Sequence, residues 1–160
     1  MPPIMKQTKR YISLFLIIIS LLFVGFYRDF VFKNINALLQ AWDADMDYQM
    51  PTSLQFLTKY EYHTLENIKW GLTLLFAIIY LAIALITIKF LFNNKKFSRL
   101  TIYTYIAITV VSALIMAIGH LFPSITDKMY SLARYLMGMA QSPIIVMILI
   151  PAFKLSEKEG

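Results

Sequence analysis

Two histidines and a glutamate on the same expected side of the membrane could in principle form a metal site. His63 and Glu66 lie three residues apart, so they would share one face of a helix, and His120 ends a later apolar run. Helical bundles that bind two iron ions need paired Glu-x-x-His motifs and further glutamates, whereas this chain has one His-x-x-Glu in the reverse order. Anchoring at a membrane interface, beside Tyr62 and Trp70, explains the same group, so no metal or other cofactor is predicted.

Arg134 is a permanent cation in the otherwise apolar stretch "SLARYLMGMAQSPIIVMILIPAF", residues 131–153. Its guanidinium could form a buried ion pair that fixes helix order, could bind a carboxylate or phosphate of a partner or lipid, or could extend to the headgroups. The carboxylates available to it on the same expected side of the membrane are Asp29, Glu61, Glu66 and Asp127. Arg28, beside Asp29, is a further candidate for binding a partner or ligand.

The same stretch carries Gln141, Ser142 and Pro143 near its middle. Pro143 has no N–H to donate to the Met139 carbonyl, and its ring crowds the preceding turn, so a kink is expected. The two polar side chains either satisfy the groups freed by the kink or line a niche for a ligand or partner. The sequence leaves both interpretations open.

Several classes of enzyme lack their residues here. The chain has no cysteine, which excludes thiol nucleophiles, disulfides, iron–sulfur clusters and thiolate zinc sites. It contains no Gly-x-Ser-x-Gly motif and no glycine-rich phosphate loop. No catalytic residue is therefore predicted.

The elements that position these residues are four long apolar runs. With 59% hydrophobic residues, the chain exceeds the roughly 45–50% that is usual in soluble proteins. Each run has the roughly 17–25 residues that cross a bilayer. The expected spans are about 8–28, 66–92, 100–122 and 129–153, with an outer loop at 29–65. Short turns between the later spans predict one membrane domain, residues 1–160, folded as an antiparallel bundle of four transmembrane helices.

The outer loop is expected to be partly helical. Apolar residues at helical spacing from Phe30 to Trp42 indicate that the first span continues as an amphipathic helix or turns to lie along the interface. Residues 52–62, "TSLQFLTKYEY", can form a short helix capped by Thr52 or Ser53.

Small and polar residues form a stripe along each span. Membrane helices associate through such residues, so the stripes are predicted to face one another. The stripes are Ser13, Ser20 and Tyr27; Thr73, Ala77, Tyr80, Ala84 and Thr87; Tyr105, Thr109, Ser112, Met116 and Gly119; and Arg134, Gly138, Gln141 and Ser142.

The distribution of cations predicts orientation. Lysines and arginines dominate the N-terminal segment, the 89–99 connection and the C-terminal segment, whereas carboxylates offset them in the other connections. The positive-inside rule then places both termini in the cytoplasm. The net charge of +6 reflects topology and contact with anionic lipid, and its dispersal at membrane ends argues against nucleic-acid binding.

Three stretches carry a resemblance to a known family. They are "GFYRDFVFKNINALL" after the first span, "KWGLTLLFAIIYL" in the second and "ARYLMGMAQSPIIVMILIPAF" in the last. Together they resemble the small membrane proteins associated with exosortases in Bacteroidetes-type bacteria, of the F-type or X-type. The resemblance implies an accessory protein of the bacterial inner membrane that acts with an exosortase. Exosortases use a cysteine nucleophile, so this cysteine-free chain resembles the companion.

Three functions remain in competition. The leading hypothesis is a non-enzymatic accessory protein that associates with another integral membrane protein. The second is a small transport, lipid-binding or anion-binding protein that uses the helix face of Arg134 and Gln141. The third is a metal-dependent membrane enzyme that uses His63, Glu66 and His120.

Overall fold

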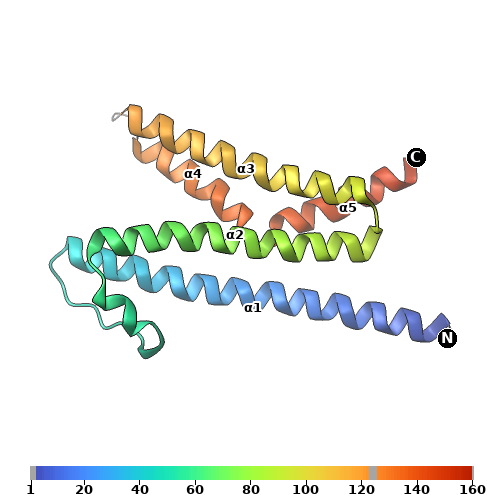
Figure 1. The fold of residues 1–160 in the computed structure, drawn as a ribbon, viewed down its shortest axis with the longest axis horizontal. Coiled ribbons are helices and arrows are strands. Elements are labelled where there is room, and N and C mark those ends of the chain that lie inside the picture. The colour runs from blue at the N-terminus through green and yellow to red at the C-terminus, as the bar shows by residue number, and fades with distance from the viewer. Residues whose placement is uncertain (1–2, 123–125, 160) are drawn as a thin grey trace. The chain divides into compact units, whose positions relative to one another are not determined.

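The computed structural model describes the backbone of residues 3–122 and 126–159, and the side chains in these ranges except those of residues 3–11, 13, 120, 127, 158 and 159. In the described residues all regular structure is helical (Figure 1). The elements are α1 (Pro3–Asp43), the 3-10 helix η1 (Thr52–Lys59), α2 (Tyr62–Phe92), α3 (Lys95–Leu121), α4 (Thr126–Ala140) and α5 (Ile144–Glu159). The prediction of an all-α chain is confirmed.

Length and hydropathy identify the helices that can cross a membrane. Among the residues that the structure describes, three single helices qualify: Leu14–Asp43, Tyr62–Phe92 and Lys95–Gly119. A fourth candidate is the pair Lys128–Ala140 and Ile144–Glu157, which is bent by 60° at the break between α4 and α5. The kink predicted at Pro143 is therefore confirmed. The chain is an all-helical protein with three to four candidate membrane-spanning helices.

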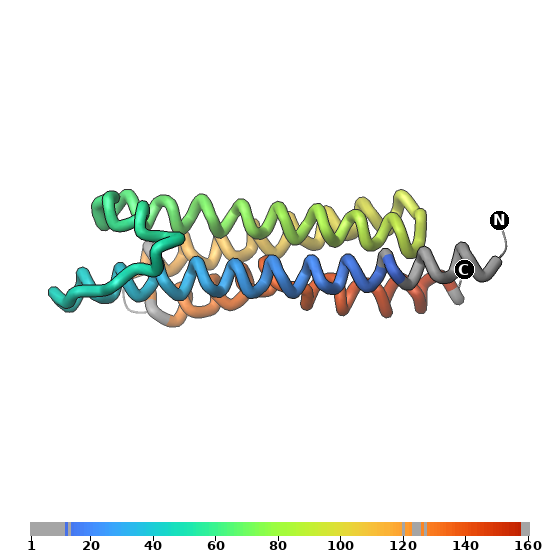
Figure 2. The backbone as a smooth tube through the Cα atoms, turned by 90° about the horizontal axis from the view of Figure 1, so that it is seen from below, coloured from blue at the N-terminus to red at the C-terminus, as the bar shows by residue number. Residues whose placement is uncertain are grey.

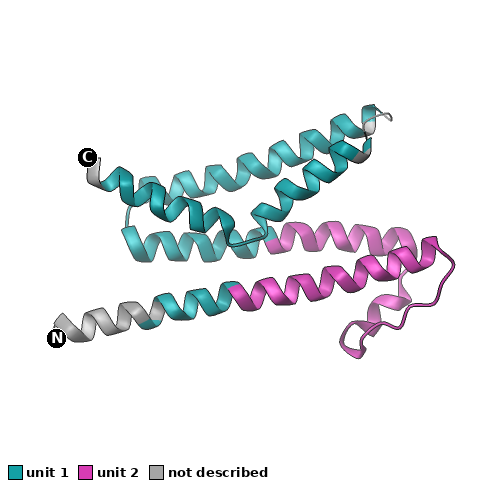
Figure 3. Cartoon of the chain, turned by 180° about the vertical axis from the view of Figure 1, so that it is seen from behind, with its two compact units in different colours: residues 1–21, 77–160 teal, residues 22–76 magenta. Residues whose placement is uncertain are grey.

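The chain divides into two compact units (Figure 3). Unit 2 comprises residues 22–76, and unit 1 comprises residues 1–21 and 77–160. Both boundaries fall inside helices, so α1 and α2 each contribute residues to both units.

Unit 2 is built around the part of α1 that follows the first apolar run. Of the two courses predicted for residues 28–42, the structure has the continuing helix, because α1 runs without interruption to Asp43. The connection then folds back, so that η1 and the start of α2 pack on α1. The buried core of this unit is Val31, Ile35, Leu38, Leu39, Leu54, Leu57 and Leu65. Burial of one such side chain stabilises the fold by about 1.5–3 kcal/mol, so this core fixes the connection.

The short helix predicted after Pro51 is present as η1, but its predicted cap is wrong. Pro51 itself occupies the N-cap position, and no side chain makes a capping hydrogen bond there. The backbone N–H of Leu54 donates instead to the Pro51 carbonyl at 2.9 Å. Proline with φ −55° and ψ 145° directs the chain into the first turn, so a side-chain cap is not needed.

Unit 1 buries most residues of the stripes predicted for the second and third spans, whereas Thr109 and Met116 are half-buried. Ala77, Tyr80 and Ala84 on α2 are buried, as are Tyr105 and Ser112 on α3. Gly119 marks a close approach of α3 and α4: a Cβ at this position would lie 2.7 Å from the Cβ of Met129. These two helices therefore pack through a small residue, as expected inside a membrane.

The stripe predicted for the first span is not buried, although the Tyr27 ring lies 6.5 Å from the Phe76 ring of α2. Ser20 and Tyr27 are exposed, and the side chain of Ser13 lies outside the described residues. The Ser20 hydroxyl donates to the Leu16 carbonyl of its own helix at 2.8 Å. Because its hydrogen bond is satisfied locally, this serine can face lipid without a partner helix.

Aromatic rings hold the other end of unit 1. Phe97 and Phe153 stack with ring centroids 4.4 Å apart and an interplanar angle of 4°. Phe92 meets both rings edge-on. The turn between α2 and α3 is as short as predicted: Asn93 adopts a positive φ of 48°, and the Asn94 side chain accepts a hydrogen bond from the Lys96 N–H at 2.9 Å. The cluster therefore joins α5 to the turn.

Candidate functional site

A buried polar pair supports the connection between α1 and α2. The Asn34 amide donates to the Phe30 carbonyl at 2.7 Å, and the Tyr48 hydroxyl donates to the Asn34 side-chain oxygen at 2.7 Å. Asn34 is 8% exposed, so both bonds lie at the edge of the unit 2 core. Sequence reasoning missed this pair. The signal was an amide on the apolar stripe of α1, between Val31 and Ile35.

The residues around this support present aromatic and acidic side chains together. We call them the cap surface: Trp42, Asp43, Asp45, Met46, Asp47, Phe56, Tyr60 and Glu61, all of which are exposed. Met46 is 63% exposed and Phe56 is 54% exposed. Leu54 and Leu57, which lie close to Phe56 in the sequence, are buried in the unit 2 core. Over residues 43–66 five carboxylates stand against one lysine, so this segment is strongly acidic.

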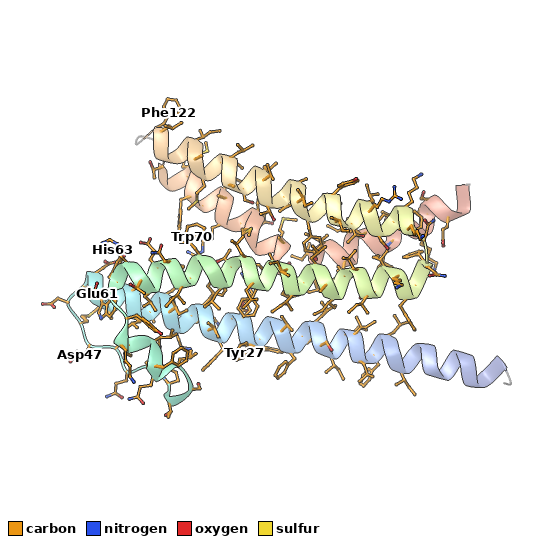
Figure 4. The ribbon with its side chains drawn as sticks, in the orientation of Figure 1. Tyr27, Asp47, Glu61, His63, Trp70 and Phe122 are labelled. Carbon is orange, nitrogen blue, oxygen red and sulfur yellow. The ribbon has the colours of Figure 1, made fainter. Side chains whose placement is uncertain are left out.

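Local contacts order one edge of the cap surface. The Trp42 and Tyr62 rings lie 6.1 Å apart between centroids, and the Tyr62 hydroxyl donates to an Asp43 carboxylate oxygen at 3.4 Å. Figure 4 shows Asp47, Glu61 and His63 at the same end of unit 2, with Trp70 further along α2. The acidic and aromatic groups thus gather where α1 gives way to α2.

The proposed metal ligands do not assemble in the described residues. His63 and Glu66 are exposed, and the His63 ring meets the Tyr62 ring edge-on at 5.8 Å. No group of three or more side chains able to hold a metal ion occurs in the part of the chain that the structure describes. The side chain of His120 lies outside that part. His63 therefore has an aromatic neighbour that fits the interfacial interpretation.

Arg28 and Asp29 bind each other. An Arg28 guanidinium nitrogen lies 3.0 Å from an Asp29 carboxylate oxygen, and the same guanidinium lies over the Phe32 ring, 5.4 Å from its centroid. The two residues are adjacent and lie in α1, so the ion pair links no separate elements. An exposed pair of this kind contributes about 0–1 kcal/mol.

Arg134 lies on α4 with an exposed side chain. Within the described part of unit 1 it makes no ion pair, and the side chain of Asp127, one of its predicted partners, is not described. The exposure does not fit the interpretation as a buried ion pair. Binding of an external anion and extension toward headgroups both remain compatible with this position.

Gln141 and Ser142 occupy the break between α4 and α5, and Ser142 has a local role there. Gln141 is 3% exposed. The Ser142 hydroxyl donates a hydrogen bond to the Met139 carbonyl at 2.9 Å. It also accepts a hydrogen bond from the Ile144 N–H at the start of α5, with the nitrogen and oxygen 3.4 Å apart. Ser142 therefore satisfies backbone groups on both sides of the kink.

Comparison with known proteins gave no relative from which a function can be transferred: no family model, characterised protein or solved structure matches the chain.

Proposed function

We propose that this chain is a non-enzymatic accessory protein of the bacterial inner membrane, and that its cap surface binds another integral membrane protein. The observation that supports the proposal is the combination of a buried leucine core with exposed rings directly above it. A connection that only joined two spans would need neither. Here the core holds Phe56 and Tyr60 outward in fixed positions, which lowers the entropy lost when a partner covers them.

The composition of the cap surface also favours protein binding. Aromatic residues and methionine are enriched in protein interfaces, and Trp42, Met46, Phe56 and Tyr60 supply both types. The surrounding carboxylates would select a partner whose contact surface is basic, because complementary charge speeds encounter and excludes wrong partners. An exosortase-type sorting protein is the proposed partner, on the resemblance of residues 25–39, 69–81 and 133–153 alone.

Photo-crosslinking in native membranes tests this proposal. A photoreactive residue at position 56 is expected to give an adduct with a second integral membrane protein, which mass spectrometry would identify. The same residue at position 155, whose leucine is 62% exposed on α5, is the control and is expected to give no such adduct. If position 56 reacts with lipid alone, the cap surface is not a protein-binding surface.

The orientation is part of the proposal. The positive-inside distribution supports cytoplasmic termini and an outward cap surface. Since the natural chain has no cysteine, single cysteines report without background. Asp47→Cys is expected to react with a membrane-impermeant thiol reagent added to intact spheroplasts, whereas Lys96→Cys is expected to react only after permeabilisation. The reverse pattern would invert the topology.

A second function, binding of an anionic lipid or small anion, is supported by the exposed guanidinium of Arg134. It predicts that Arg134→Ala weakens retention of phosphatidylglycerol on the purified protein, while Arg134→Lys keeps part of it. Equal lipid retention by the wild type and Arg134→Ala would eliminate this candidate.

A further inference from the structure

Buried hydroxyl groups in unit 1 follow one rule. Thr87, Thr101 and Ser112 are at most 5% exposed, and each donates to the carbonyl four residues earlier in its own helix, at 2.7 to 2.9 Å. The Tyr80 hydroxyl, also buried, donates to the Leu21 carbonyl at 3.3 Å. Hydroxyl groups inside a membrane protein need such partners, because no bulk water can replace them.

Tyr105 breaks this rule. Its side chain is 3% exposed. Of the buried side-chain nitrogen and oxygen atoms that the structure describes, its hydroxyl oxygen is the one without a hydrogen-bond partner. Tyr105 is too long to bond the preceding turn of α3 as the threonines do. A phenylalanine would fill the same space without an unmet hydroxyl, so the oxygen requires an explanation.

The break between α4 and α5 releases acceptors. In a continuous helix the Ser142 N–H would donate to the Gly138 carbonyl and the Ile144 N–H to the Ala140 carbonyl. Here the Ser142 N–H donates to the Met139 carbonyl at 3.2 Å, and the Ile144 N–H turns to the Ser142 hydroxyl. The carbonyls of Gly138 and Ala140 therefore lose their helical donors, and Ala140 is completely buried.

The helix register brings Tyr105 and the break to one depth. Gly119 on α3 and Met129 on α4 touch at one end of this helix pair. From there, Tyr105 and Pro143 are each fourteen residues away along their own segments, which corresponds to about 21 Å of helical rise. Figure 2 shows the break at the level of the middle of α2, where the unit 1 part of that helix begins. Tyr80, which interacts electrostatically with Tyr105, lies on α2 close to Ala77, where the unit 1 part of α2 begins.

We propose that Tyr105 and the α4–α5 break form an internal hydration site, in which a water molecule accepts a hydrogen bond from the Tyr105 hydroxyl and donates hydrogen bonds to the freed carbonyls of Gly138 and Ala140. Water has the required two donors and two acceptors, and buried waters commonly make about three such bonds. The site lets a proline-broken span exist in the membrane interior, because it satisfies groups that lipid cannot.

Thermal unfolding of the full chain in lipid nanodiscs tests the bond to Tyr105. Tyr105→Phe is expected to lower the midpoint by about 2–4 °C. Tyr103→Phe is the matched control on the same helix, because Tyr103 is 63% exposed, and it is expected to leave the midpoint unchanged. An unchanged or raised midpoint for Tyr105→Phe would overturn the proposal.

Magnetisation transfer from water to backbone amides, measured by solid-state NMR, identifies the partner. Early transfer is expected at Gln141 and Ser142 in the wild type and is expected to be lost in Tyr105→Phe. If the wild type shows no early transfer while Tyr105→Phe is destabilised, the hydroxyl bonds a protein atom and the hydration site is wrong.

Discussion

The two units bury different mixtures of side chains. Unit 2 buries mainly leucine, isoleucine and valine beneath its connection. Unit 1 buries alanine, threonine, serine and tyrosine beside large apolar residues such as Ile88, and it leaves others such as Ile78 and Ile86 exposed. A leucine core is the arrangement that water favours, because leucine gains free energy by leaving water. In lipid that gain vanishes, and close packing and hydrogen bonds decide what is buried. Exposure therefore has different meanings in the two units.

The largest expected effect lies in the core of unit 2. Leu57→Ala removes a side chain that is 3% exposed and should destabilise this unit by about 2–5 kcal/mol, through lost burial and the cavity left behind. Limited proteolysis between residues 44 and 61 is the measurement. Phe56→Ala, at a 54% exposed neighbour, is the control and should leave cleavage unchanged. Equal cleavage of both variants would mean that the leucine core does not fix the connection.

In unit 1 the sharpest test compares two glycines. Gly119→Ala places a methyl 2.7 Å from the Met129 Cβ and should destabilise the α3–α4 pair by about 1–3 kcal/mol. Gly138→Ala meets no atom within 4 Å and should stabilise α4 by about 0.5–1 kcal/mol through helix propensity. Thermal unfolding in detergent should thus shift in opposite directions. A shift of the same sign in both variants would contradict packing through Gly119.

The smallest effect concerns the polar support of the unit 2 core. Tyr48→Phe deletes the 2.7 Å bond to Asn34 and should cost about 0.5–1.5 kcal/mol. Hydrogen exchange of the amides around Tyr48 should accelerate accordingly. Tyr60→Phe, at a 42% exposed ring, serves as its control and should not change exchange. No acceleration in Tyr48→Phe would show that the pair is not needed to hold the connection.

Sequence reasoning succeeded where the composition of a short stretch of the chain decides the outcome. Long apolar runs located the candidate membrane-spanning helices, Pro143 located the break, and the short 93–94 connection followed from its composition. The residues from Phe30 to Trp42 carried a helical period, but the sequence could not choose between a continuing helix and an interfacial one. That choice depends on η1 covering the apolar face of α1, which is a contact distant in the chain.

Local hydrogen bonds explain two of the errors. Ser20 was assigned to a buried stripe, yet a serine that bonds its own helix can face either side. Thr52 and Ser53 were assigned as caps, but Pro51 sets the first turn. The sequence contains several carboxylates that could pair with Arg134, but it does not show how far each lies from the Arg134 guanidinium. The unmet hydroxyl of Tyr105 is invisible in sequence, because it depends on which atoms reach the ring.

The length of α1 sets a strict geometric requirement. After the apolar run ends at Tyr27, the helix continues for sixteen residues to Asp43, or roughly 24 Å at 1.5 Å per residue. Adding one residue within this extension would advance its far end by about 1.5 Å and rotate it by roughly 100°. Trp42 and Asp43 would then face a different side of the helix axis. The length of α1 therefore fixes the direction in which the cap surface faces a docking molecule. An insertion in this extension would misalign that surface, and a compensating deletion in α1 would restore its alignment.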